Sequence, residues 1–285
     1  MSSTMVPLTT EPAAPPRSTL AALARADALR FARHPLFLFG VAVCLLLLAS
    51  VAIGGDPAPL ESTVAPAFFL GVFGFVVAHR LTTSLRRTPD LAEISPVDQR
   101  RRTISLCLAC LVPTGVAVAM MAGSLVAAAV WPPVAIPAGD PVSWFGHEPT
   151  VDILAALVEG GPVAALGGSL LGVAVGRWAP FRGSALLALL VLVVGTAIAD
   201  GWTSGWAAIA PYQIFSDSLV VDGQLRSSWL VEWLSPRWHL AYALCLCGLA
   251  VVAALLRDGT GRRQLLAVSA ALTVAAAGAL LLAVR

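Results

Sequence analysis

The chain has 285 residues, of which 58% are hydrophobic and 12% are charged, and its formal net charge is +2. Soluble domains are about half apolar and about a quarter charged, whereas the mean hydropathy of this chain is +0.84. These values exclude an ordinary soluble domain and indicate a membrane protein. We expect no nucleic-acid partner.

Residues 1–17, MSSTMVPLTTEPAAPPR, are polar and proline-rich and show no hydrophobic periodicity. This composition predicts a disordered tail. It does not predict a signal peptide, because the first apolar run starts too late and no small-residue cleavage site follows it.

Residues 18–34 predict an amphipathic helix that lies in the headgroup layer of a membrane. Ser18 is a suitable N-cap, and Pro35 ends the helix and turns the chain into the first span. One helical face is apolar and carries Leu20, Leu23, Ala24, Ala28 and Phe31, while the opposite face carries Arg25, Arg30 and Arg33. Asp27 interrupts the apolar face, and we expect it to pair with Arg30 three residues later.

Residues 35–285 predict a single transmembrane domain, so the expected fold class is an all-α polytopic membrane protein. A helical crossing needs roughly 20 mostly apolar residues. Continuous Leu/Ala/Val-rich runs favour helices over the alternating pattern of a β-barrel. Seven such runs occur, at Leu36–Ile53, Val64–Leu85, Ile104–Trp131, Ile153–Val175, Gly183–Ala199, Trp238–Leu256 and Leu265–Val284.

The arginines predict the orientation, because loops rich in basic residues stay in the cytoplasm. All 18 basic residues are arginine. Four segments on one side hold most of them: Arg17, Arg25, Arg30 and Arg33; Arg86, Arg87, Arg100, Arg101 and Arg102; Arg177 and Arg182; and Arg257, Arg262 and Arg263. The opposite loops are acidic, with Arg226 and Arg237 as their cations. We therefore expect a cytoplasmic N-terminus and an external C-terminus.

The loop 86–102 contains the pattern of a helix of about two turns. Thr88 is a suitable cap, Pro89 occupies the first helical position, and Pro96 stops the helix. Leu91 and Ile94 share one side and offer an apolar contact surface. A helix this short needs a partner to rest on. The alternative is that the loop arginines only hold the topology and contact anionic lipid.

The fourth run contains an ionisable residue, Glu159, roughly 10 Å from its external end at 1.5 Å per residue. An ionisable group inside a span is a functional hypothesis by default, so Glu159 is a candidate for a substrate path, a gate or proton coupling. The alternative is that Glu159 is protonated or reaches the interface. Gly160, Gly161 and Pro162 predict a kink or opening of the helix, and Gly167, Gly168 and Gly172 predict close helix packing.

The five cysteines and four histidines do not predict a metal site or a catalytic site. CLAC, with Cys107 and Cys110, and CLC, with Cys245 and Cys247, fall in different halves of different spans, so core packing is the better interpretation. The histidines fall in four separate regions, at His34, His79, His147 and His239, without a hydrolase or metalloprotease motif. We therefore do not expect an enzyme.

The external segment 200–237 is rich in tryptophan, as aromatic belts at a membrane interface are. Within it, SSWLVEWL places Trp229, Leu230, Trp233 and Leu234 at helical spacing after Ser227 or Ser228 as a cap. This pattern predicts an interfacial or re-entrant helix.

These features together resemble the ABC-2 type permeases, the membrane subunits of ABC exporters. The resemblance rests on an amphipathic helix before the first span, a short helix between spans two and three, and a long external segment before span six. SLRRTPDLAEISPVDQRRRTISLCLACLVP and LSPRWHLAYALCLCGLAVVAALLRDGTGRRQLLAV resemble actinobacterial members. The family core has six spans, so the C-terminal run is an additional helix.

The resemblance implies roles for two segments. It implies that Leu91, Glu93, Ile94 and Pro96 dock on an ATPase and transmit its motion, and that the external segment, with Trp229 and Trp233, forms a gate over the substrate path. It further implies an exporter in a bacterial plasma membrane, built as a homodimer or with a paired permease.

The absence of lysine excludes a P-loop in this chain, because that motif needs its Lys to reach the β- and γ-phosphates. ATP and Mg²⁺ would therefore bind to a separate ATPase subunit, and this chain binds no cofactor of its own in the predicted arrangement. Two other classes stay open, a secondary transporter and a membrane scaffold that transports nothing.

Overall fold

The computed structural model describes residues 18–54, 66–84, 98–130, 150–181, 183–200, 207–211, 217–221, 224–228, 234–259 and 261–284. Its elements in chain order are α1 (Ser18–Ala32), α2 (Pro35–Gly54), the π-helix η1 (Pro66–Leu70), α4 (Gly71–Ser84), α6 (Gln99–Ala109), α7 (Leu111–Val130), α8 (Thr150–Val158), the π-helix η2 (Glu159–Val163), α9 (Ala164–Trp178), α10 (Ser184–Asp200), the 3₁₀ turn η3 (Ala207–Ile209), β1 (Asp217–Val221), β2 (Gln224–Ser228), α11 (Pro236–Leu256) and α12 (Arg262–Ala283).

A helix occupies each of the predicted apolar runs. Within the described ranges, four helices are long and apolar enough to cross a membrane: Gln99–Val126, Thr150–Trp178, Pro236–Leu256 and Arg262–Ala283. The bent pair α1–α2 makes a fifth when it is counted as one span, and two apolar helices, Phe68–Ser84 and Ser184–Thr196, are shorter. These lengths and compositions indicate a helical membrane protein.

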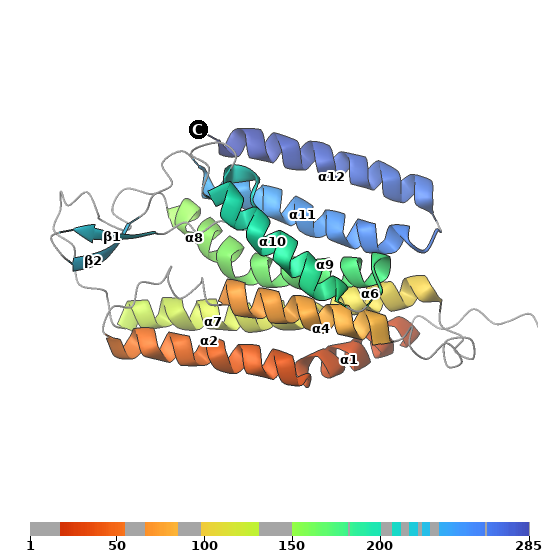
Figure 1. The fold of residues 1–285 in the computed structure, drawn as a ribbon, viewed down its shortest axis with the longest axis horizontal. Helices are drawn as coiled ribbons and strands as arrows, with labels where there is room; N and C mark the ends of the chain where they lie inside the picture. Colours follow the sequence, from red (N-terminus) through yellow and green to blue (C-terminus); the bar gives the residue numbers. More distant parts are fainter. Residues whose placement is uncertain are drawn as a thin grey trace, which may run out of the picture.

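The helices run side by side along the long axis of the molecule (Figure 1). Across the bundle, α12 packs on α11, α11 packs on α9, and α9 packs on α4, with α2 against η1 and α4. α7 contacts η1, η2 and α9. α9 therefore lies in the centre of the bundle, between α4 and α11.

Glycines allow α4 and α9 to approach each other closely. A Cβ atom at Gly168 would lie 2.5 Å from the carbonyl oxygen of Gly71, and one at Gly172 would lie 2.3 Å from that of Phe75. These contacts confirm the close packing predicted for Gly168 and Gly172, which are four residues apart on one face of α9. Gly176 extends the same face, because its Cβ would lie 2.9 Å from Cβ of Thr82.

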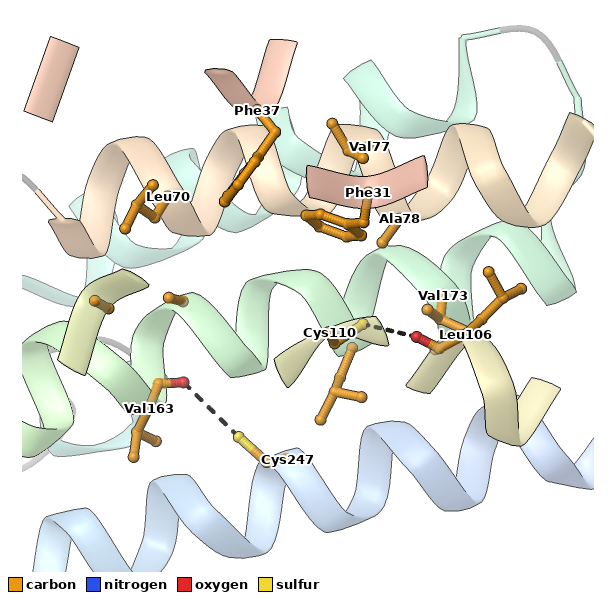
Figure 2. Close-up of a cluster of buried hydrophobic side chains, with 14 of the residues drawn as sticks. Phe31, Phe37, Leu70, Val77, Ala78, Leu106, Cys110, Val163, Val173 and Cys247 are labelled. Atoms are coloured by element: carbon orange, nitrogen blue, oxygen red, sulfur yellow. Dashed lines mark hydrogen bonds between the residues drawn. The ribbon is translucent and has the colours of Figure 1, made fainter. Parts of the chain in front are cut away.

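The main core joins nine elements around α9, and Figure 2 shows part of it. Phe31 and Phe37 pack edge to face across the α1–α2 junction, with ring centroids 5.3 Å apart. Cys44, Cys110 and Cys247 are buried among these apolar side chains, and the Cys110 thiol donates to the carbonyl of Leu106 at 3.3 Å. The core-packing interpretation is confirmed for Cys110 and Cys247.

The amphipathic face predicted for residues 18–34 is the face that packs on the bundle. α1 lies against α6, and α1 and α2 are bent by 59° at their junction. Phe31 is buried, whereas Arg25, Arg30 and Arg33 are exposed. Asp27 is also buried; it pairs with Arg30 at 3.6 Å, as predicted, and accepts a hydrogen bond from Ser105 Oγ at 2.5 Å. α1 therefore packs on the helical bundle by the face that was expected to contact lipid.

His34 occupies the bend between α1 and α2. Its Nδ1 accepts a hydrogen bond from the backbone N–H of Leu36 at 3.2 Å. Burial, and to a lesser degree the charge of Arg80, lowers the pKa of His34. The lowered pKa favours the neutral imidazole, which is the form that accepts at Nδ1.

The segment between α10 and α11 contains β1 and β2, which pair antiparallel with Val220 opposite Leu225. Ser227 and Ser228, the predicted caps of a helix over SSWLVEWL, belong to β2, and residues 229–233 of that predicted helix lie outside the described residues. Leu234 forms an isolated antiparallel bridge with Val284.

Candidate functional site

A buried carboxylate and a buried imidazole meet inside the bundle. Glu159 begins the π-turn η2, and His239 lies in the first turns of α11. Glu159 is 2% exposed and His239 is fully buried. Oε1 of Glu159 is hydrogen-bonded to Nδ1 of His239. We call these two residues the Glu159–His239 pair.

The local sequence explains why Glu159 lies in a π-turn. Pro162 has no N–H to donate, and its ring conflicts with a regular α-helical turn. Gly160 and Gly161 supply backbone freedom directly before it. Single π-turns inside α-helices are frequent at functional sites. The helix opening predicted from this stretch is therefore present, as a π-turn between α8 and α9.

Both ring nitrogens of His239 have partners. Nε2 lies 3.0 Å from the carbonyl oxygen of Ala208 in η3. Nearby, the Tyr242 hydroxyl donates to the carbonyl of Ile209 at 2.8 Å. In contrast, Oε2 of Glu159 is buried and has no hydrogen-bond partner among the residues that the structure describes. Two side chains of α11 thus hold η3 in place, and one of them also holds Glu159.

A second ionic contact lies beside the pair. Asp152 in α8 is fully buried, and its Oδ1 is 3.2 Å from Nε of Arg237, whose side chain is 51% exposed. Asp152 and Glu159 are seven residues apart, which places them on one face two turns from each other. Arg237 and His239 approach that face from α11. The opposite charges of Asp152 and Arg237 cancel, so this ion pair adds no net charge beside Glu159.

A different polar cluster occupies the other end of the bundle. Arg177, near the end of α9, pairs with Asp258, and both side chains are about 5% exposed or less. Thr103 in α6 donates to Asp258 at 3.3 Å. Trp178 Nε1 donates to the carbonyl of Ala253 at 2.7 Å, and the Arg257 guanidinium lies 5.5 Å from the Trp178 ring. These contacts join α6, α9 and the α11–α12 turn.

The two polar clusters are separated by the length of α9. Glu159 and Arg177 are 18 residues apart in sequence, which corresponds to about 27 Å along a helix. One cluster contains the Glu159–His239 pair and the other the arginine-rich end. η2 and α9, which follow each other directly in the chain, therefore connect the two polar clusters.

The structure describes one of the predicted site residues. Glu159 is buried and contacts His239, so the alternative in which it reaches outward to the interface is wrong. The predicted ATPase-coupling residues, Leu91, Glu93, Ile94 and Pro96, lie outside the described residues, as do Trp229, Trp233 and the tail 1–17. Within the described part of the chain, no group of three or more His, Cys, Asp or Glu side chains is placed to hold a metal ion.

Sequence reasoning missed His239, Asp152 and Arg237 as members of one cluster. His239 is 80 residues from Glu159, and a single histidine at a span boundary gave no reason to connect the two. The spacing of Asp152 and Glu159 on one face of a span was a usable signal. Buried carboxylates need cationic side chains or hydrogen-bond donors as partners. Arg237 and His239, spaced by two residues, are such partners on another span.

Comparisons with family models, with curated proteins and with solved structures found no match to this chain. The fold itself defines the class of the molecule, a helical membrane protein with buried polar clusters at both ends of its bundle.

Proposed function

We propose that this chain is the membrane-spanning permease subunit of an ATP-driven ABC exporter in a bacterial plasma membrane. The proposal takes the six helical runs up to α11 as the permease core and α12 as an additional seventh span. One observation carries it: α1, the end of α4 and the start of α6 meet at a single arginine-rich end of the bundle. This arrangement suits a face that receives a second protein.

The arginine distribution supports a cytoplasmic location for that end. It holds Arg25, Arg30, Arg33, Arg80, Arg100, Arg101, Arg102, Arg177, Arg257, Arg262 and Arg263. Of the described arginines, the opposite end holds Arg226 in β2 and Arg237 at the start of α11. The positive-inside rule then assigns the N-terminus to the cytoplasm and the C-terminus to the outside.

The contacts of α1 support a coupling role for the loop 86–102. This loop leaves α4 at Ser84 and enters α6 at Gln99, and α1 packs along α6. A movement of the loop would therefore reach α1 through α6, and the central α9 through Thr103, Asp258 and Arg177. We assign the docking contact to Leu91, Glu93, Ile94 and Pro96.

The transport path in this proposal lies between two permease copies or paired permeases, with Trp229 and Trp233 at its external side. Glu159 is buried inside the bundle, so we assign it to a gate and not to the wall of this path. α10 and α12 expose many apolar side chains, among them Leu186, Val191, Val274 and Leu281. Such faces suit lipid or a second membrane subunit. ATP and Mg²⁺ bind to the separate ATPase subunit, whose hydrolysis drives alternating exposure of the path.

Co-purification tests the proposal. The native chain is expected to retain a P-loop ATPase in mild detergent, and the double variant Leu91→Arg with Ile94→Arg is expected to lose it while its helical content stays native. The control, Ala92→Arg with Gln99→Arg, adds the same two charges off the Leu91/Ile94 side and is expected to retain the ATPase. Absence of any ATPase with the cross-linked native chain would overturn the proposal.

One observation favours a second candidate, a secondary transporter. A buried carboxylate hydrogen-bonded to a histidine inside a bundle is the type of group that carries protons in transporters. The two candidates differ in their energy source. Vesicle transport that continues without ATP and stops when a pH gradient is removed would support the secondary transporter.

A further inference from the structure

The surroundings of His239 determine where one of its protons lies. The atom facing Nε2 is the carbonyl oxygen of Ala208, at 3.0 Å. A carbonyl oxygen accepts hydrogen bonds and cannot donate them. Nε2 must therefore carry a hydrogen and donate it, which fixes the tautomer of the neutral ring.

The other ring nitrogen then shares a proton with Glu159. Nδ1 and Oε1 are hydrogen-bonded, so one hydrogen lies between them. If Glu159 holds it, the carboxyl group donates to a neutral imidazole; if His239 holds it, an imidazolium donates to a carboxylate. Both arrangements contain the same number of protons and have zero net charge.

We propose that Glu159 and His239 form a buried proton-binding site, in which one exchangeable proton lies between Oε1 of Glu159 and Nδ1 of His239. Loss of this proton places a carboxylate against the lone pair of Nδ1. Oε2 of Glu159 does not compensate for this loss, because it has no hydrogen-bond donor among the described residues. The pair is therefore held together by its proton.

The other charged and titratable groups near the pair do not take over the role of this proton. Among the elements packed on η2, α7 and η1 contain no ionisable side chain; their sequences are LVPTGVAVAMMAGSLVAAAV and PAFFL. α8 contributes Asp152, which is paired with Arg237. α11 contributes Tyr242, which donates to Ile209, together with Cys245 and Cys247. α9 contributes Arg177, about 27 Å away along the helix.

The proton links three elements that are distant in sequence. Glu159 belongs to the π-turn between α8 and α9, His239 belongs to α11, and Ala208 belongs to η3. Release of the proton removes the hydrogen bond between Glu159 of η2 and His239 of α11, while the contact between His239 and Ala208 stays. The binding site thus connects its proton occupancy to the packing of the central helix. This inference is independent of the proposed ATPase partner.

Nitrogen NMR of the full chain in lipid, labelled with ¹⁵N at histidine, tests the site. The chain has four histidines. The signals of His239 are assigned as those that are absent from the spectrum of the His239→Gln variant. In the native chain, Nε2 is expected to stay protonated over the whole pH range, and Nδ1 is expected to shift in a single titration. Loss of the Nε2 proton in that titration, or an Nδ1 signal that never shifts, would overturn the proposal.

Glu159→Gln is the decisive variant. The Gln amide keeps the size of the side chain and donates an N–H to Nδ1, and a proton on the buried ring would have no carboxylate to balance its charge. The titration of the pair is therefore expected to disappear while the fold persists. Asp152→Asn is the matched control, because it removes the other buried carboxylate of the same helical face; the His239 titration is expected to remain. An unchanged titration in Glu159→Gln, or its loss in the folded Asp152→Asn variant, would each contradict the shared proton.

Discussion

Replacement of Gly172 by alanine is expected to force α4 and α9 apart. The added Cβ would lie 2.3 Å from the carbonyl oxygen of Phe75 and 2.9 Å from its carbonyl carbon and Cα. All three atoms belong to the backbone, so no side-chain rotation can make room. Ordinary contact between a Cβ and an oxygen needs a separation larger by roughly 1 Å, and the two helices must separate by a comparable distance.

The expected cost is that of an overpacked core. Forced shifts of this kind destabilise a protein by about 1–3 kcal/mol, and each kcal/mol lowers the Tm of a chain of this size by roughly 2–4 °C. Thermal unfolding in mild detergent can be followed with a thiol-reactive fluorescent dye. Cys44, Cys110 and Cys247 are buried, so they become reactive when the bundle opens.

Two open glycines provide matched controls. An added Cβ at Gly123 in α7 or at Gly195 in α10 meets nothing within 4 Å. Alanine there is expected to leave the Tm unchanged or to raise it, because Ala is a better helix former than Gly by up to about 1 kcal/mol. Equal Tm values for Gly172→Ala and Gly123→Ala would refute the close contact between α4 and α9.

Two further predictions concern buried polar contacts at the arginine-rich end. Arg177→Ala leaves the buried carboxylate of Asp258 without its cation, so it is expected to cost about 3–5 kcal/mol; the same dye assay measures it, and Arg177→Met combined with Asp258→Leu is expected to recover most of the loss. Asp27→Ala leaves the Ser105 hydroxyl without its acceptor at an expected cost of about 1–3 kcal/mol. Limited proteolysis within α1 should become faster in Asp27→Ala and return toward the native rate in Asp27→Ala with Ser105→Ala; an unchanged rate in the single variant would contradict this anchoring role.

Sequence periodicity predicted the apolar face of α1 but not the surface that this face contacts. Leu20 and Phe31 share that face in the predicted helix and in α1 of the structure, because helical spacing is a local property of the chain. The contact with α6 depends on Ser105, whose hydroxyl reaches Asp27 from 78 residues away. A buried aspartate that first looked like a defect in a lipid-facing surface is therefore a polar anchor between two helices.

Local signals also predicted the break in the fourth span, since Gly160, Gly161 and Pro162 act on the backbone around them. They did not predict the destination of the Glu159 side chain. His239 is 80 residues away, and its position depends on how α11 packs against α8, η2 and α9.

Hydropathy and glycine spacing alone determined that this chain is a helical membrane protein and that Gly168 and Gly172 allow close packing, because these properties depend on residues within a few turns of each other. Only the tertiary structure decided which buried charges meet. Glu159 contacts His239, and Arg177 contacts Asp258 81 residues later. A charge inside an apolar bundle needs a partner, but the identity of that partner depends on which helices become neighbours.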